Sequence, residues 1–199
     1  VTVTGQMLAS PLGVGGFGDT PLTRLPFAAS VLGEGRLRDA GAKSASDLAR
    51  LDAGVSASYD AEGYWTSISA RGYQVDNRAN YRRDGLPIHG ETVIHLGNKR
   101  SMELLKGTSG MLAGTSAPGG LVNLVVERPQ RALRSATLEA RDSGSVLAAV
   151  DVGERFGDGE RFGWRVNAAA ERLDPPARNA TGRRHLFALA ADAQLGRDT

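Results

Sequence analysis

The sequence predicts an α+β domain, built from a small mixed sheet with short helices and long loops, followed by antiparallel β-strands of an incomplete transmembrane β-barrel. The first observation is a change of hydrophobic period. Short irregular segments between residues 26 and 130 give way to a two-residue alternation from about Ser135 onward. The second is the 26 glycines among 199 residues, which are spread along the chain and favour many turns over long helices.

The N-terminal part begins with two segments of contrasting composition. Residues 1–5, VTVTG, form a short β-prone strip, and residues 9–26 are rich in Gly, Pro and small residues, which is typical of an extended linker. A first strand is then predicted over residues 27–32, and short helical turns over residues 34–40 and 45–51.

The next part contains short strands separated by long loops. Residues 65–71 alternate as a strand should, and Asp84-Gly85 is a hairpin-type turn after residues 80–83. A short strand is predicted over residues 103–106. Residues 121–126 are almost continuously apolar, as in a buried central strand. Helix and strand mix without a βαβ rhythm, so this part is predicted to be a compact α+β domain.

Four segments of about ten residues, separated by turn signals, follow from Ser135, and this length suits a tilted strand crossing a bilayer. The alternation alone also fits a soluble antiparallel meander. The unpaired strand edges at Thr199 favour the barrel and predict that the chain stops before the barrel closes. The clearest segment places Trp164, Val166, Ala168 and Ala170 on one face and Arg165, Asn167, Ala169 and Glu171 on the other.

Composition and spacing argue against several functional classes. The absence of cysteine excludes disulfides and thiol catalysis, and a net charge of +2 with interleaved signs gives no basic stripe for nucleic acid. Gly13, Gly15 and Gly18 match a dinucleotide-binding spacing but lack the flanking strand and helix. His89 and His95 lack zinc-motif spacing. No catalytic set stands out, so no enzyme, metal site or protein-bound cofactor is predicted.

A family resemblance is carried by four motifs. In order, they are SARGYQVDN (69–77), NYRRDGLPI (80–88), MELLKGTSGMLAG (102–114) and SAPGGLVNLVVERP (116–129). Together they resemble the plug of TonB-dependent siderophore receptors of the bacterial outer membrane, and the last motif is the most specific. The chain departs from the family pattern at Ser101, Thr108 and Ala113.

The resemblance divides the chain into three parts. Residues 1–25 resemble a TonB box with a flexible linker, residues 26–130 the plug, and residues 131–199 the first strands of the outer-membrane barrel. It implies a Gram-negative outer-membrane receptor whose plug faces the periplasm and whose barrel meets outer-membrane lipid. The function would be TonB-energised import of ferric siderophores, in which the siderophore coordinates the iron and the protein holds no cofactor.

Three groups of site residues follow from the resemblance. The strip that would contact TonB, by adding a strand to a sheet edge of that partner, consists of Val1, Thr2, Val3, Thr4 and Gly5. The basic positions that would lock the plug to barrel carboxylates are Arg71 and Lys106. The apical loops that would bind the siderophore carry Tyr59, Tyr64, Tyr73, Gln74, Asn77, Arg78, Tyr81 and His89.

The charge of the chelate and the wider role of the receptor are further expectations. Arg78, Arg82 and Arg83 could attract an anionic chelate. Two other interpretations stay open. One is a receptor that also signals to transcription, which requires an extra domain before the TonB box. The other is a stand-alone plug-like binding module, secreted or periplasmic. Further alternating strands after Thr199 would favour transport.

Overall fold

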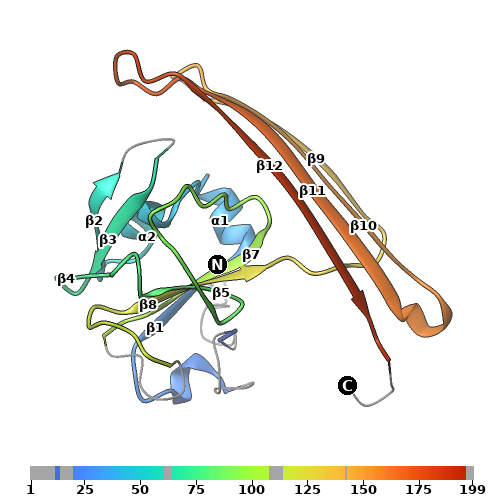
Figure 1. Ribbon diagram of the computed structural model, residues 1–199, viewed down its shortest axis with the longest axis horizontal. Helices are drawn as coiled ribbons and strands as arrows, with labels where there is room; N and C mark the ends of the chain where they lie inside the picture. Colours follow the sequence, from blue (N-terminus) through green and yellow to red (C-terminus); the bar gives the residue numbers. More distant parts are fainter. Residues whose placement is uncertain (1–11, 14–19, 61–63, 108–113, 142, 196–199) are drawn as a thin grey trace, which may run out of the picture. The chain divides into compact units, whose positions relative to one another are not determined.

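The chain divides into two compact units, residues 1–126 and residues 127–199 (Figure 1). The computed structural model describes residues 12–13, 20–60, 64–107, 114–141 and 143–195. The first unit combines two sheets with short helices, and the second is one antiparallel sheet. This confirms the predicted fold class. In the described part of the chain, no helix has both the length and the apolar composition needed to cross a membrane.

Short elements make up the first unit. Its helical turns are η2 (Leu22–Arg24), α1 (Glu34–Asp39), η3 (Ala45–Asp47) and α2 (Leu48–Leu51). Its strands are β1 (Ala29–Gly33), β2 (Val55–Asp60), β3 (Thr66–Ala70), β4 (Tyr73–Gln74), β5 (Tyr81–Arg83), β6 (Leu86–Ile88), β7 (Lys99–Leu105) and β8 (Leu121–Val126). Strand β2 is absent from the sequence prediction, because its side chains are mostly exposed and show no apolar alternation.

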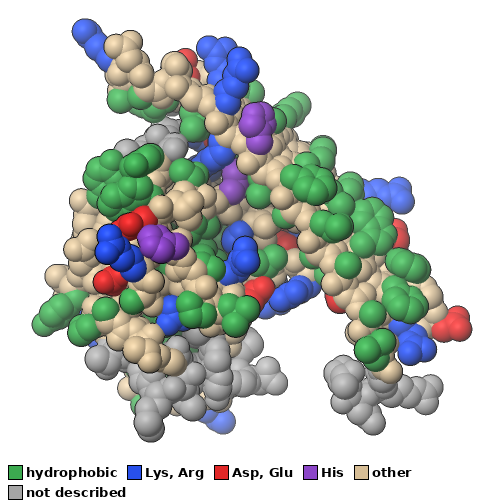
Figure 2. All heavy atoms as spheres, viewed as in Figure 1, with side chains coloured by type: hydrophobic (Ala, Val, Ile, Leu, Met, Phe, Trp, Pro, Cys, Tyr) green, Lys and Arg blue, Asp and Glu red, His purple; other side chains and the backbone are tan. Residues whose placement is uncertain are grey.

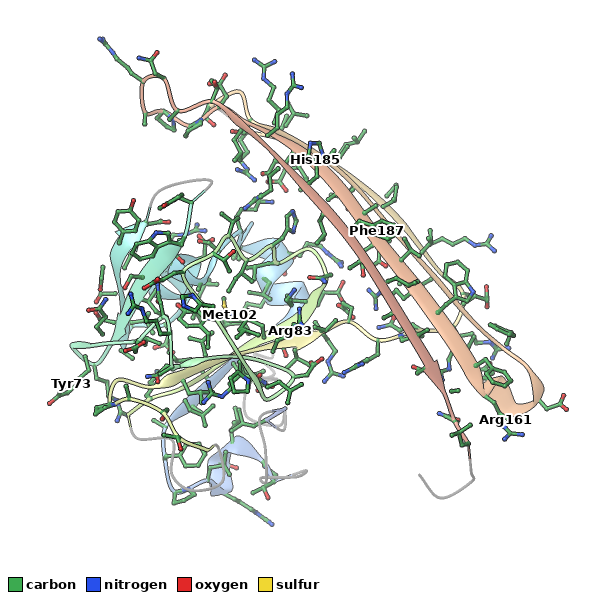
Figure 3. All side chains as sticks on the ribbon, viewed as in Figure 1. Tyr73, Arg83, Met102, Arg161, His185 and Phe187 are labelled. Carbon is green, nitrogen blue, oxygen red and sulfur yellow. The ribbon has the colours of Figure 1, made fainter. Side chains whose placement is uncertain are left out.

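The larger sheet of the first unit has the strand order β1-β7-β8-β5-β6, and the smaller has the order β2-β3-β4. Pairing in the larger sheet is antiparallel except between β5 and β8. The core lies where β3, β7 and β8 meet the short helices, and it includes Met102, Leu104 and Ile68, which are all 0% exposed (Figure 3).

Two tight turns of the first unit use a residue pair with positive φ. Asp84 and Gly85, at φ 50° and 79°, join β5 to β6, which confirms the predicted hairpin turn. Arg71 and Gly72, at φ 52° and 84°, join β3 to β4 in the same way. The second turn projects Tyr73 outward from the smaller sheet (Figure 3).

Part of the predicted linker docks on the larger sheet. Leu12 is 5% exposed and belongs to an apolar cluster that includes Leu121. The backbone N–H of Gly13 donates to Oε1 of Glu103 at 2.7 Å. Although residues 9–26 have the composition of an extended linker, these contacts fix Leu12 and Gly13 to the first unit, because an apolar side chain and a buried carboxylate both find partners there.

The second unit is a sheet of long neighbouring strands in the order β12-β11-β10-β9. Every pair is antiparallel, and the register runs without interruption. The elements are β9 (Leu133–Ala140), β10 (Val146–Phe156), the turn η5 (Asp158–Glu160), β11 (Phe162–Leu173) and β12 (Gly182–Ala193). All four strands lie at the positions where the two-residue alternation predicts them.

The apolar face of this sheet is the exposed one. On that face Phe187 is 74% exposed and Leu189 is 67% exposed, and Figure 2 shows apolar side chains gathered over these strands. On the opposite face Arg165 is 2% and Glu171 is 3% exposed. A water-soluble meander would bury its apolar face, so the structure disagrees with that alternative. An apolar exposed face with a polar inner face is the pattern of a sheet that meets lipid.

Arginine–carboxylate pairs form on the face of the sheet that carries the buried Arg165 and Glu171. Arg165 donates to Glu127 at 2.7 Å and to Asp151 at 2.5 Å. Glu171 accepts from Arg141 at 2.7 Å and from Arg184 at 2.5 Å. Charges removed from water persist only when paired in this way. The Arg165–Asp151 pair joins β11 to β10, and the Glu171–Arg184 pair joins β11 to β12.

Candidate ligand pocket

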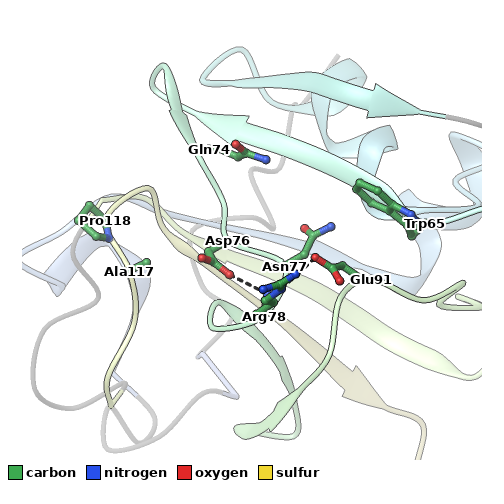
Figure 4. A pocket seen from close by; sticks show the side chains of 8 residues that line it. All are labelled: Trp65, Gln74, Asp76, Asn77, Arg78, Glu91, Ala117 and Pro118. Carbon is green, nitrogen blue, oxygen red and sulfur yellow. Dashed lines mark hydrogen bonds and ion pairs between the residues drawn. The ribbon is translucent and has the colours of Figure 1, made fainter.

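A cavity of about 430 Å³ lies in the first unit, where the loop after β4 meets the smaller sheet (Figure 4). This volume falls within the usual range of small-molecule sites. Side chains from four separate stretches of sequence enclose the cavity, and all of them belong to the same unit. Its lining residues are Trp65, Gln74, Asp76, Asn77, Arg78, Glu91, Ala117 and Pro118.

Asn80 fixes one wall of the pocket. Its side chain is 0% exposed and donates to the carbonyl oxygens of Ala117, at 2.9 Å, and Gly120, at 2.6 Å. The backbone N–H of Ala117 donates back to the Asn80 side chain at 2.7 Å. Gly119 closes this wall tightly, because a Cβ there would lie 2.4 Å from the carbonyl oxygen of Gln74.

Asp76 shapes the loop that forms the floor. Its Oδ1 accepts hydrogen bonds from the backbone N–H groups of Arg78, at 2.7 Å, and Ala79, at 3.0 Å. A short acidic side chain commonly stabilises a turn in this way. Arg78 then extends toward Glu91, and its Nε lies 3.2 Å from Oε1 of that residue. This pair brings the loop after β6 to the loop after β4.

Asn77 is the most buried polar residue of the lining, with 8% exposure. Its Nδ2 donates to the carbonyl oxygen of Thr66 at 3.0 Å. Its Oδ1 is buried and has no hydrogen-bond partner among the described residues. An acceptor buried without a donor costs about 1–3 kcal/mol, so this atom favours a donor supplied from outside the chain.

Three aromatic rings, including that of the lining residue Trp65, lie at the edge of the pocket. The ring centroid of Trp65 lies 4.7 Å from that of Tyr59 and 6.1 Å from that of Tyr64. Both tyrosine rings are substantially exposed, at 43% and 59%. Three neighbouring aromatic rings therefore offer a partly exposed apolar surface beside the polar wall.

The structure brings some of the predicted ligand residues together and separates others. Gln74, Asn77 and Arg78 line the pocket, and Tyr59 and Tyr64 lie beside it through Trp65. The remaining three do not line it. Exposed side chains occur at Tyr73 and His89, whereas the side chain of Tyr81 is 1% exposed and packs in the core.

Tyr81 and Arg82 serve the architecture of the loops. Burial raises the pKa of the Tyr81 phenol above its usual range, and its ring meets Gly90 so closely that a Cβ there would lie 2.7 Å away. Arg82 is 5% exposed and donates to the carbonyl oxygens of Ala79, at 2.6 Å, and Thr115, at 2.7 Å. Arg82 therefore orders the backbone and is not directed at a ligand.

The two basic residues predicted to lock a plug to barrel carboxylates have different surroundings. Lys106 is paired within the first unit, with Nζ 2.7 Å from Asp52. Burial alone would raise the pKa of Asp52, but hydrogen bonds from Lys106, Ser30 and the Gly54 N–H outweigh it and hold that pKa below its usual range. Arg71 is exposed at the β3–β4 turn. Pairing of either residue with a barrel carboxylate stays a prediction.

Sequence reasoning missed five of the eight lining residues. Asp76 lies between the predicted ligand residues Gln74 and Asn77, and Glu91 follows the predicted His89 by two positions, so a search for carboxylates beside predicted ligand residues would have found both. No local signal marks Ala117 and Pro118, because the fold alone brings them to Gln74.

The predicted TonB-contact strip, residues 1–5, lies outside the described residues. No group of three or more metal-ligating side chains occurs within the described ranges.

Comparison with known proteins identifies the family of the first unit. The family model described as the TonB-dependent Receptor Plug Domain matches residues 21–121, which is just over half of the chain. This range includes every residue that lines the pocket.

Several proteins of similar sequence are named as receptors or transporters. The chain is 27% identical to the ferrichrome receptor FcuA of Yersinia enterocolitica, over 77% of this chain and 21% of that protein. It is 24% identical to the ferrichrome outer membrane transporter/phage receptor of Escherichia coli, over 86% and 24%. It is 27% identical to the ferrioxamine B receptor of Salmonella typhimurium, over 78% and 23%. The chain thus spans about a quarter or less of the length of these relatives.

Solved structures share the fold of both units. BauA, the ferric preacinetobactin receptor of Acinetobacter baumannii, matches 98% of this chain and 30% of its own, with a TM-score of 0.83 and 24% identity. The ferric-catecholate import receptor Fiu of E. coli K12, in its open form, matches 96% and 28%, with a TM-score of 0.80 and 23% identity. At these identities the likeness establishes the fold alone.

Proposed function

The chain belongs to the family of TonB-dependent receptor plug domains, and from that premise we propose that its protein binds ferric siderophores and imports them across the outer membrane with energy from TonB. The family places the chain in the outer membrane of a Gram-negative bacterium. The family consists of receptors and transporters, which agrees with the prediction that the chain is not an enzyme.

The observation that carries the proposal is that the sheet of the second unit exposes its apolar face and buries its polar face. Strand β11 has 12 residues, so it is about 36 Å long and spans about 28 Å at a tilt of about 40°. From Phe162 to Ala170 the exposed face of β11 is apolar, and Arg172 ends it. The aromatic rings of Phe156 and Phe162 lie together at the other end, with their centroids 5.7 Å apart. A sheet of this kind, joined to a domain with a ligand pocket, suits a membrane receptor for a small solute.

Relatives supply the class of solute. Proteins named as receptors for ferrichrome, ferrioxamine B and preacinetobactin resemble this chain. The pocket offers aromatic rings beside hydrogen-bonding groups, a combination that suits a polar chelate with an organic periphery. The siderophore would coordinate the iron, so the protein would need no metal ligands of its own.

Energy coupling would enter through the N-terminal strip. Residues 1–4 are all β-branched and Gly5 follows them, and such a strip can add a strand to the sheet edge of a partner. Backbone hydrogen bonds would supply most of this affinity. Val3→Pro removes a backbone N–H and should abolish uptake, whereas Val3→Ala keeps that donor and should retain most uptake.

Uptake of radiolabelled iron tests the whole proposal. Cells would carry the full-length gene, with and without residues 1–5, and would receive a panel of ferric siderophores. We expect one chelate to be taken up by the intact receptor only, while the shortened receptor still binds it at the surface. If cells that hold the intact receptor in the outer membrane take up no chelate, the proposal is wrong.

A further inference from the structure

The lining of the pocket has an unusual charge balance for a site that would receive an iron chelate. Asp76 and Glu91 contribute two carboxylates, and Arg78 contributes the single cation. The lining therefore carries a formal charge of −1 at neutral pH. The expectation that arginines attract an anionic chelate does not fit this balance, because Arg82 is bound to backbone carbonyls and Arg83 does not line the pocket.

Two oxygen atoms of the lining can accept hydrogen bonds from a ligand. Only the Nε of Arg78 donates to Oε1 of Glu91, at 3.2 Å. Gln74 donates through Nε2 to the hydroxyl of Ser67 at 3.0 Å, which leaves its carbonyl oxygen as an acceptor. The buried Oδ1 of Asn77 has no donor among the described residues. The carbonyl oxygen of Gln74 and the Oδ1 of Asn77 can therefore accept hydrogen bonds from a ligand that carries N–H or O–H groups.

Aromatic rings complete the pattern. Trp65 lines the pocket, and Tyr59 and Tyr64 lie against it. The face of an indole or phenol ring attracts a cation, whereas it has no such attraction for an anion. Carboxylates beside exposed aromatic rings are thus suited to a protonated amine.

We propose that this pocket selects ferric chelates of zero or positive net charge, favours those with a protonated amine, and discriminates against anionic chelates. The proposal rests on the proposed function and specifies the chelate class at the same site. Glu91 is the group that sets the preference, because its removal brings the formal charge of the lining to zero and releases Arg78. Asp76 is less suitable for a test because its carboxylate also forms the turn.

A matched series of probes isolates the charge of the ligand. The probes are a linear ferric trihydroxamate ending in a free amine, its N-acetyl derivative and its N-succinyl derivative, which differ by one charge at each step. Binding to the purified full-length receptor is measured at low and high salt. We expect affinity to fall about tenfold per step, the size for unit charges about 6 Å apart at an effective dielectric constant of about 40. High salt should reduce the difference.

Two variants locate the origin of the preference. Glu91→Gln should abolish or reverse the order of the three affinities. Glu34→Gln, which changes an exposed carboxylate on α1 outside the pocket, should keep the wild-type order. Tight binding of the succinyl probe by the wild-type receptor would overturn the inference while leaving the proposed function intact, and so would an unchanged order in Glu91→Gln. A receptor that binds no ferric chelate at all would overturn both.

Discussion

Replacing Gly119 with alanine should open the wall of the pocket. Gly119 has a φ of 123°, a region that residues with a Cβ rarely adopt, and its Cβ would lie 2.4 Å from the carbonyl oxygen of Gln74. The two segments must separate by about 1 Å to reach an ordinary contact. Strain of this kind costs about 1–3 kcal/mol, and the forced separation weakens the Asn80 hydrogen bonds as well.

We therefore expect local stability to fall by about 2–4 kcal/mol. Hydrogen exchange in the full-length receptor measures this as faster exchange at the amides of Ala117 and Val122, by about 30- to 1000-fold. Gly35→Ala is the matched control, because Gly35 lies in α1 with nothing within 4 Å of the added Cβ. If both variants exchange at the wild-type rate, the close contact at Gly119 does not support the wall.

The other predictions concern two of the buried charge systems. Lys106→Met leaves the Asp52 carboxylate without its cation and should destabilise the first unit locally by about 2–4 kcal/mol, measured by hydrogen exchange of the full-length receptor. The pKa of Asp52 is held low in the folded state, so its stabilising contribution is present above pH ~4 and is lost as the pH falls through the folded value. Limited proteolysis across that range should show faster cleavage at low pH, and a flat profile would contradict the sign. Arg165→Met removes the guanidinium that pairs with the buried Glu127 and should lower the melting temperature of the receptor in detergent by several degrees. Arg183→Met, which removes an exposed arginine from the same sheet, is its control, and equal melting temperatures would refute a role for the buried pair.

Local sequence patterns predict the strands and turns whose conformation depends on neighbouring residues. The alternation in residues 162–173 predicts both the strand and the division of its side chains between two faces. The Asp84-Gly85 pair predicts its hairpin because few other residues tolerate positive φ at both positions. Strand β2 escaped prediction because its pairing with β3, and not its own composition, holds it extended.

Contacts between distant segments escaped sequence reasoning. Leu12 stands in a segment with the composition of a linker, but its side chain is buried because the fold brings it to Val31, Leu105 and Leu121. Tyr81 is an aromatic residue with a hydroxyl group, which is why the sequence predicts a ligand contact there, yet its ring packs in the core. In both cases, burial depends on which surfaces the fold brings together.

The sequence by itself determined the class of fold, the family resemblance and the two-faced character of the last four strands, since each depends on residue types at short spacings. Only the tertiary structure decided which face is exposed and which residues enclose the pocket. The Asn80 side chain and the close approach of Gly119 to Gln74 hold the loops of Asp76 and Pro118 together, and the Arg78–Glu91 pair brings in the loop of Glu91. The charge balance of the pocket, and with it the expected preference among chelates, arises from that meeting.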